Sequence, residues 1–145
     1  MRYLEEFKQI LFNTYNLYFK MQLYHWNING INFLELHKLF EEHYTEYAQA
    51  TDQLAEHIRL HNVLLEIDLA TIAAQNKLGA ALKEQNAKKL LKDTLNSNKQ
   101  IYSEILALIE KLTTPKEETT KDLLIARMHV HQKNIWLLSA LQEEM

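Results

Sequence analysis

Residues 24–56 read YHWNINGINFLELHKLFEEHYTEYAQATDQLAE, a turn followed by a long helical pattern. The turn is expected at residues 27–32, where asparagines surround Gly30, the residue best able to adopt a left-handed backbone. After the turn, apolar side chains recur in steps of three, four or seven from Phe33 to Leu54. That spacing is typical of an α-helix that buries one face. The stretch therefore predicts the end of one helix and most of a second.

The same periodicity extends along the chain in both directions. It predicts four long helices, over residues 2–28, 33–61, 85–112 and from Thr114 to near the end. The last helix has the clearest start, because Thr114-Pro115-Lys116-Glu117 combines an N-cap, a proline at the first helical position and a capping glutamate. Asn62 is expected to end the second helix in a left-handed conformation. Asp68 predicts the cap of a short linking helix that ends before Gly79.

The composition also favours a helical bundle. The chain has 145 residues but only 2 Gly and 1 Pro, too few for the many corners of a β-sandwich or barrel. Hydrophobic residues make up 47% and charged residues 24%, which is ordinary for a globular protein. We expect one all-α domain over residues 1–145, a four-helix bundle with a short helix between the second and third long helices.

Charge and cysteine content bear on partners and location. The chain has no cysteine, no signal-peptide pattern and no uncharged stretch long enough to span a bilayer, so we expect a cytoplasmic protein without membrane contact. Its 16 basic and 19 acidic residues are interleaved and give a formal net charge of -3. With neither a basic patch nor a lysine-rich tail evident, DNA binding is not expected.

Four polar residues point to a metal site. His25 and His37 flank the first turn, while Asp52 and Glu56 lie one helical turn apart farther along the second helix. Imidazoles and carboxylates together are a usual ligand set for iron, zinc or manganese. The alternative is that the two acids form a solvated face and that each histidine is an ordinary surface residue.

The spacing of these residues decides how they could meet. His37 and Asp52 are fifteen residues apart, about 22 Å along a helix, so they cannot share one metal within a chain. They differ by only about 60° around the helix and therefore lie on one broad face. An antiparallel two-fold pairing of this helix would bring His37 of one subunit opposite Asp52 of the other. The spacing thus suggests two sites per dimer, each using histidines of one subunit and carboxylates of its partner.

The remaining histidines are weaker candidates. We expect His57 and His61 at the surface and His43 on an exposed polar face, and we expect His129 and His131 to point to different faces of their helix. A di-iron site within one bundle needs Glu-x-x-His pairs, and no histidine here has a glutamate three residues before it. An intrasubunit site is therefore not expected.

The segment around the first turn resembles the signature of the Dps miniferritins, a family that includes the bacterial neutrophil-activating proteins. The matching residues are Tyr24-His25-Trp26-Asn27-Ile28-Asn29-Gly30, Phe33, Leu36-His37, Phe40-Glu41, Tyr44 and Asp52-Gln53-Leu54-Ala55-Glu56. Ile135-Trp136-Leu137-Leu138 is also similar to the last helix of the family. The chain departs from the family at His57, where Arg is common, and at Asn62, where Gly is usual.

The resemblance implies a hollow dodecamer of ferritin-like bundles built from two-fold dimers. Its ferroxidase centres would use His25 and His37 of one subunit with Asp52 and Glu56 of the other, while Glu41 assists a second, weaker iron and Trp26 lies beside the site. The implied activity is iron storage and detoxification by oxidation of Fe(II), preferably with hydrogen peroxide, followed by deposition of ferric oxide in the shell. This chemistry would protect against oxidative stress. Zinc or manganese would be substitutes for iron.

Some alternatives stay open at this point. Glu117, Glu118 and Asp122 either line a pore through which iron enters or simply compensate the dipole of the last helix. The shell could bind metal without enzymatic oxidation, or it could protect DNA. A purely structural bundle, in which the His-Trp-Asn segment only packs, is the remaining interpretation.

Overall fold

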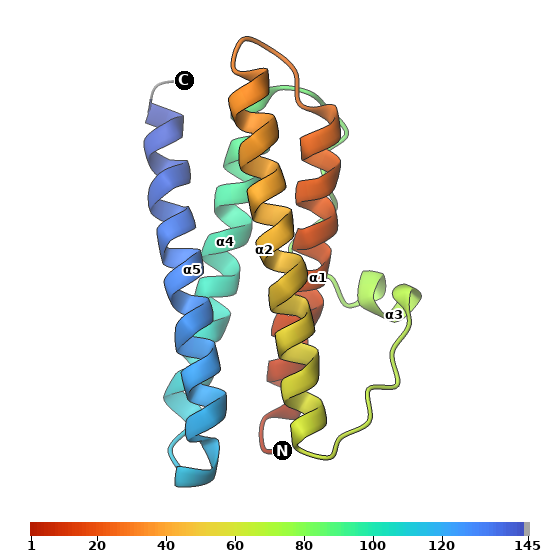
Figure 1. Cartoon of the computed structure of the whole chain (residues 1–145), viewed down its shortest axis with the longest axis vertical. Helices are drawn as coiled ribbons and strands as arrows, with labels where there is room; N and C mark the ends of the chain where they lie inside the picture. The colour runs from red at the N-terminus through yellow and green to blue at the C-terminus, as the bar shows by residue number, and fades with distance from the viewer. Residues whose placement is uncertain (144–145) are drawn as a thin grey trace.

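The computed structural model describes residues 1–143, which form five α-helices and no strand. Four long helices lie side by side and a short one stands apart from them (Figure 1). Their bounds are α1 Leu4–Asn27, α2 Phe33–Leu60, α3 Leu69–Ala74, α4 Ala87–Lys111 and α5 Glu118–Glu143, with a 3-10 turn at Pro115–Glu117. The predicted all-α bundle with a short linking helix is confirmed.

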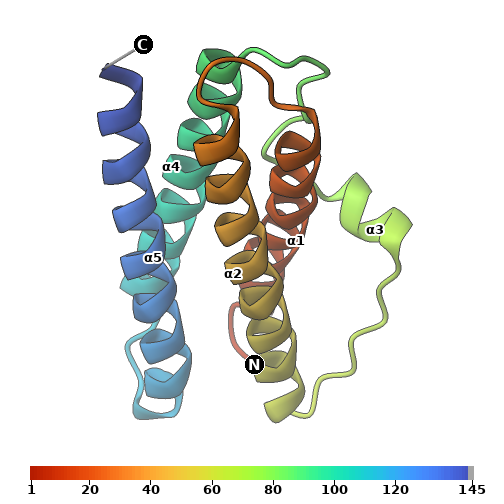
Figure 2. The same ribbon diagram turned by 45° about the horizontal axis from the view of Figure 1, so that its top comes forward.

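The long connection between α2 and α4 sets the topology. It runs from one end of the bundle to the other past α3, so α2 and α4 run in the same direction while α1 and α5 run opposite to them (Figures 1 and 2). At the far end, the amide of Asn29 donates to the carbonyl oxygen of Gln85 at 3.3 Å. The turn between α1 and α2 is thereby joined to the end of the connection.

The predicted helix boundaries are confirmed to within a few residues. Asp68 caps α3 by accepting from the amide of Thr71 at 2.7 Å, and Asn62 has φ 60 after the end of α2. Gly30 has φ 114, so the turn before α2 uses the backbone freedom of glycine. The carboxylate of Glu117 accepts from the amide and the hydroxyl of Thr114, at 3.2 and 2.7 Å.

The apolar stripes meet in one core. Its largest fully buried side chains include Tyr24, Tyr47, Phe7 and Phe40. The periodicity also assigned Phe33 to this core. That prediction is wrong, because the side chain of Phe33 is 40% exposed. It is the first residue of α2, and its ring stacks on His37 instead, with centroids 5.0 Å apart.

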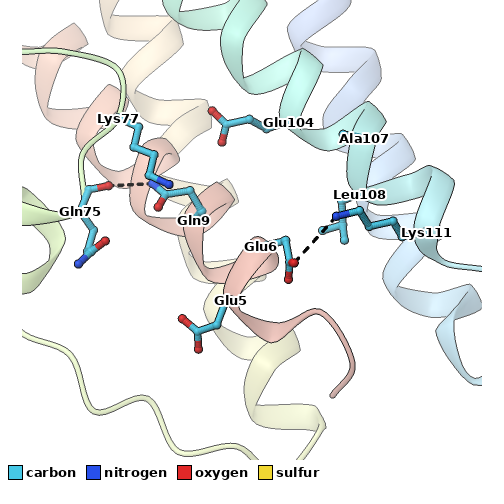
Figure 3. A pocket seen from close by; sticks show the side chains of 9 residues that line it. All are labelled: Glu5, Glu6, Gln9, Gln75, Lys77, Glu104, Ala107, Leu108 and Lys111. Atoms are coloured by element: carbon cyan, nitrogen blue, oxygen red, sulfur yellow. Dashed lines mark hydrogen bonds and ion pairs between the residues drawn. The ribbon is translucent and has the colours of Figure 1, made fainter.

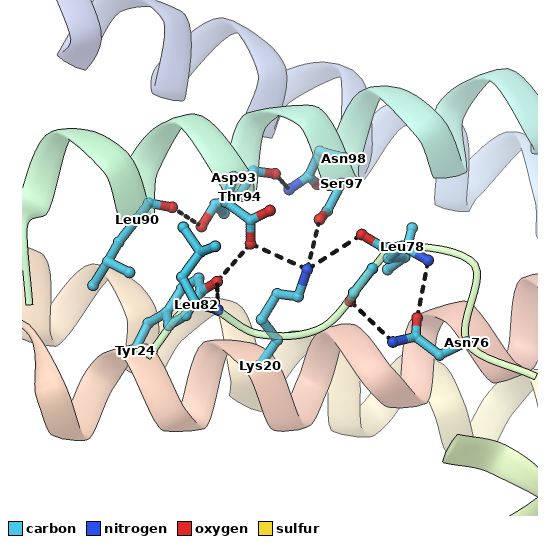
Figure 4. Close-up of polar contacts among 11 residues, drawn as sticks. Lys20, Tyr24, Asn76, Leu78, Leu82, Leu90, Asp93, Thr94, Ser97 and Asn98 are labelled. Carbon is cyan, nitrogen blue, oxygen red and sulfur yellow. Dashed lines mark hydrogen bonds and ion pairs between the residues drawn. The ribbon is translucent and has the colours of Figure 1, made fainter. Parts of the chain in front are cut away.

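Polar side chains of α1 attach the long connection to the bundle (Figure 4). Lys20 is 2% exposed, and its ammonium lies 3.1 Å from a carboxylate oxygen of Asp93 on α4. Tyr24 donates to the same carboxylate and accepts from the amide of Leu82 at 3.0 Å. Because a buried cation is costly unless it is paired, these contacts bind α1, α4 and the connection together.

Candidate metal centre

His25 and His37 are held against each other across the turn between α1 and α2. Their rings stack with centroids 3.7 Å apart and planes inclined by 14°. The Nδ1 atom of His25 lies 2.7 Å from the carbonyl oxygen of His37, and the Nδ1 atom of His37 lies 2.7 Å from the carbonyl oxygen of His25. The sequence positions these residues on either side of a turn, but only folding brings their rings together.

This reciprocal bonding determines the tautomer that each ring adopts when it is neutral. A carbonyl oxygen can only accept, so each Nδ1 must carry the proton. In the neutral rings, each Nε2 then has a free lone pair, which is the form that binds a metal ion. Hydrogen bonding of the second ring nitrogen to a backbone carbonyl is a common way to orient a metal-binding histidine.

Asp52 and Glu56 form a second cluster on α2. Both side chains are exposed and lie one turn apart on the same face. A hydrogen bond to Asp52 raises the pKa of Glu56, and the charge of Asp52 raises it further. The two carboxylates are therefore close enough to bind one cation together, and a cation would relieve their repulsion.

The two clusters do not meet within one subunit. Among residues 1–143, no group of three or more His, Asp or Glu side chains is arranged to hold a metal ion. Asp52 follows His37 by fifteen residues of continuous helix, about 22 Å. Each subunit thus carries an imidazole pair near the start of α2 and a carboxylate pair beyond its middle, and we call them the imidazole half and the carboxylate half.

Glu41 and Trp26 flank the imidazole half. Glu41 follows His37 by one turn of α2 and is exposed. Trp26 follows His25 directly and is 57% exposed at the end of α1. Both side chains are therefore accessible at the surface of the subunit.

Three other histidines are buried, which corrects two of the expectations from the sequence. His57 was expected at the surface, but it is buried and its Nε2 lies 2.7 Å from the hydroxyl of Thr120 on α5. His43 was expected on an exposed face, yet it is buried beside Tyr47. The cause in both cases is α5, which covers a flank of α2 that looks polar in sequence. The prediction that His129 and His131 point to different faces is confirmed, since His131 is fully buried and His129 is exposed.

The acids at the start of the last helix have different environments. The carboxylate of Glu117 pairs with Arg2 and accepts a hydrogen bond from the hydroxyl of Thr114, and these bonds lower the pKa of Glu117 to about 2. Glu118 and Asp122 are exposed. Glu117 therefore has a structural role, and only Glu118 and Asp122 keep free carboxylates for a pore.

A polar hollow outside these clusters lies between α1, α4 and the segment after α3 (Figure 3). Among its lining side chains, Glu104 is half-buried, and burial raises its pKa. Its two carboxylate oxygens accept from the amide of Asn13 at 3.0 and 2.9 Å. The hollow contains no histidine, and the carboxylate of Glu104 is already bonded, so it is a poor metal site.

No helix among residues 1–143 is long and apolar enough to cross a membrane.

Residues 4–145 match the family model described as Ferritin-like domain. Over 134 residues the chain is 33% identical to a DNA protection during starvation protein of Brevibacillus brevis, covering 88% of this chain and 85% of the relative. It is 28% identical to the protein of the same name from Helicobacter pylori, covering 97% of this chain and 98% of the relative.

Solved structures resemble this chain throughout its length. Dps from Staphylococcus aureus superposes with a TM-score of 0.90 at 25% identity, covering 95% of this chain and 93% of that one. Dps from Thermosynechococcus elongatus gives a TM-score of 0.88 at 25% identity, covering 94% of this chain and 87% of that one.

Proposed function

Since the chain belongs to the ferritin-like family, and within it to the Dps miniferritins, we propose that it oxidises Fe(II) and stores the product as ferric oxide. The oxidation takes place at sites completed between two subunits, and hydrogen peroxide is the preferred oxidant. The protein works in the cytoplasm as a shell of identical subunits, a dodecamer built from two-fold dimers. Its role is iron storage and protection against oxidative damage.

One observation carries the proposal: the reciprocal bonding of His25 and His37, which orients two metal-binding nitrogens at a place where the subunit has no carboxylate pair to complete a site. The missing carboxylates are present about 22 Å away on the same helix. An antiparallel pairing of two α2 helices would place each half beside the complementary half of the other subunit. The separation of the histidine pair from the carboxylate pair along α2 is then the spacing that two paired subunits require.

The residue types suit iron as a substrate. The Nε2 atoms of His25 and His37 bind incoming Fe(II), and the hard carboxylates of Asp52 and Glu56 favour Fe(III), which helps oxidation to proceed. Glu41 would hold a second, more weakly bound iron. Two Fe(II) ions give one electron each to one peroxide, which takes up two protons and leaves as two waters. Zinc or manganese would occupy the same donors.

The test is anaerobic Fe(II) oxidation by hydrogen peroxide at low iron loading, followed by the same measurement with oxygen alone. Wild type is compared with the Asp52→Ala, Glu56→Ala double variant, after both are shown to assemble. The Glu5→Ala, Glu110→Ala variant is the matched control, because it removes the same charge from exposed positions elsewhere. We expect rapid oxidation and soluble ferric product from wild type and control only. Equal activity in all three would refute the proposed site.

A second function, DNA protection, is favoured by a surface on α4. Lys88, Lys92 and Lys99 are exposed and lie within about 40° of one another around the helix, with exposed Lys89 at the edge of this group. This lysine face is a basic patch that is not evident along the sequence, because Asp93 and several uncharged residues separate the lysines. Phosphate binding by such a face weakens steeply with salt. The test is a DNA retardation assay with the triple variant Lys88→Ala, Lys92→Ala, Lys99→Ala. As a control, a second variant replaces Lys111, Lys116 and Lys133 by Ala. Retardation that is lost in the first variant and kept in the second would support this function.

A further inference from the structure

The residue directly before His25 is held from three sides. Tyr24 is fully buried, and its hydroxyl donates to a carboxylate oxygen of Asp93 on α4 at 2.5 Å (Figure 4). The same hydroxyl accepts from the amide of Leu82 in the connection at 3.0 Å. The ring of Tyr24 meets Phe40 of α2 edge-on, with centroids 5.9 Å apart. The last turn of α1 is therefore attached through one side chain to α2, to α4 and to the connection.

The backbone of Tyr24 also shapes the turn between the two histidines. Its carbonyl oxygen accepts from the amide of Ile28 at 2.9 Å, where α1 ends. Phe40 follows His37 by three residues, so the two lie on the same side of α2. Tyr24 thus fixes the backbone before His25 and packs beside the helical turn that carries His37.

The geometry of the histidine pair depends on this attachment. Each Nδ1 bonds to the backbone carbonyl of the other histidine, so the orientations of both rings follow the relative position of the ends of α1 and α2. Donor atoms bind a metal well only when they are held within about 0.5 Å of the required geometry. Helical periodicity and burial explain an aromatic ring at position 24, and Phe would satisfy both. What the hydroxyl adds is the pair of hydrogen bonds to Asp93 and Leu82.

We propose that Tyr24 is a positioning residue of the candidate metal centre, because its anchored hydroxyl holds His25 and His37 in the arrangement that binds Fe(II). The proposal rests on the proposed binding of Fe(II) by these histidines. Tyr24 is not itself a ligand, since its hydroxyl is turned toward α4 and is bonded to both Asp93 and Leu82 (Figure 4). Its contribution therefore lies in the affinity for metal and not in the rate of the oxidation step.

The experiment measures metal affinity in assembled, anaerobic protein with Co(II), a probe that peroxide-free buffer does not oxidise and whose visible absorption changes on binding. Fe(II) oxidation by hydrogen peroxide is then measured over a range of Fe(II) concentrations. Wild type is compared with Tyr24→Phe and with the matched control Tyr47→Phe. Tyr47 is also fully buried, and its hydroxyl also donates one hydrogen bond, to Asn98, and accepts one, from Asn134. It lies ten residues beyond His37 on α2, about 15 Å away.

The two variants should differ in metal binding and not in the kind of bond that they lose. In Tyr24→Phe we expect the affinity for Co(II) to fall about tenfold, a loss typical of replacing a residue that orients a metal ligand. The Fe(II) concentration that gives half the maximal rate should rise by a similar factor, while the maximal rate is unchanged. Tyr47→Phe should equal wild type in both measurements, although it loses stability as well.

A second pair of proteins tests the same hydrogen bond from the α4 side and decides the question even if Tyr24→Phe does not assemble. Both carry Lys20→Met, so that no buried ammonium is left unpaired. One also carries Asp93→Ala, and the other Asp93→Asn, which keeps an oxygen that can accept from Tyr24. We expect the Ala protein to lose Co(II) affinity as Tyr24→Phe does, and the Asn protein to retain most of it.

The possible failures are distinguishable. Equal Co(II) affinity in wild type and Tyr24→Phe, an equal loss in Tyr24→Phe and Tyr47→Phe, or equal affinities in the Ala and Asn proteins would overturn the positioning role and leave the proposed function standing. If wild type neither binds Co(II) nor oxidises Fe(II) with peroxide, both proposals are overturned.

Discussion

His25 and His37 each place Nδ1 2.7 Å from the carbonyl oxygen of the other residue, so the backbone of each residue orients the imidazole of the other. The arrangement also joins the last turn of α1 to the first turn of α2. Replacing either histidine removes one nitrogen of the candidate metal centre and also leaves the surviving ring without its stacking partner. We expect each single substitution to weaken metal binding by more than the loss of one ligand alone.

Mixing inactive subunits should restore activity if the site is shared. We expect His37→Ala and Asp52→Ala proteins to be inactive separately. A mixed dimer contains one site with all four residues intact, so random exchange should restore about a quarter of wild-type activity. Fe(II) oxidation before and after subunit exchange measures this. An inactive mixture with exchange proven by mass spectrometry would contradict a shared site.

Replacing Asp93 alone should lower the free energy of unfolding more than replacing Asp93 and its partner Lys20 together. Lys20 is buried, and Asp93→Ala would leave its ammonium unpaired, at a cost of about 3–5 kcal/mol. In Lys20→Met, Asp93→Ala no buried charge remains, so part of the loss should be recovered. Chemical denaturation of the four proteins of this double-mutant cycle gives the interaction energy. Equal destabilisation in the single and double variants would show that the charge pair is unimportant.

His43 should make the fold sensitive to acid. Burial lowers the pKa of His43 from 6.5 to about 4, only partly opposed by Glu46, and Arg127 and His131 lie in the same buried region. The unfolded chain therefore binds a proton more readily, and stability is lost as the pH falls from 6.5 to 4, by roughly 3 kcal/mol. The free energy of unfolding of His43→Leu should depend less on pH in this window. An unchanged pH dependence would assign the effect to another group.

Glu117 should stabilise the protein except in strong acid. Its pairing with Arg2 lowers the folded-state pKa from 4.5 to about 2. The contribution is therefore complete above pH 4.5 and is lost as the pH falls toward 2. Thermal unfolding should show Glu117→Gln to be less stable than wild type at neutral pH, with a difference that shrinks below pH 4. A difference that is the same at all pH values would indicate that the charge is not responsible.

The residues of the candidate site could be identified from sequence because their signals are local. His25 and His37 flank a turn marked by Gly30, and Asp52 and Glu56 share a helix face by spacing. The environments of His43 and His57 could not be identified in this way. Their burial depends on α5, whose nearest residues lie more than sixty positions away along the chain, and helical periodicity contains no information about which helix covers which flank.

The sequence by itself determined the helices, their caps and the spacing of the side chains of the candidate metal centre, since each follows from residues a few positions apart. Only the tertiary structure decided that the two imidazoles bond to each other's backbone, that Lys20 is buried against Asp93 and that the hydroxyl of Tyr24 is bonded to Asp93 and Leu82. These relationships depend on how α1 packs against α2 and α4. Packing joins residues that are distant along the chain, so it emerges only when the whole bundle is assembled.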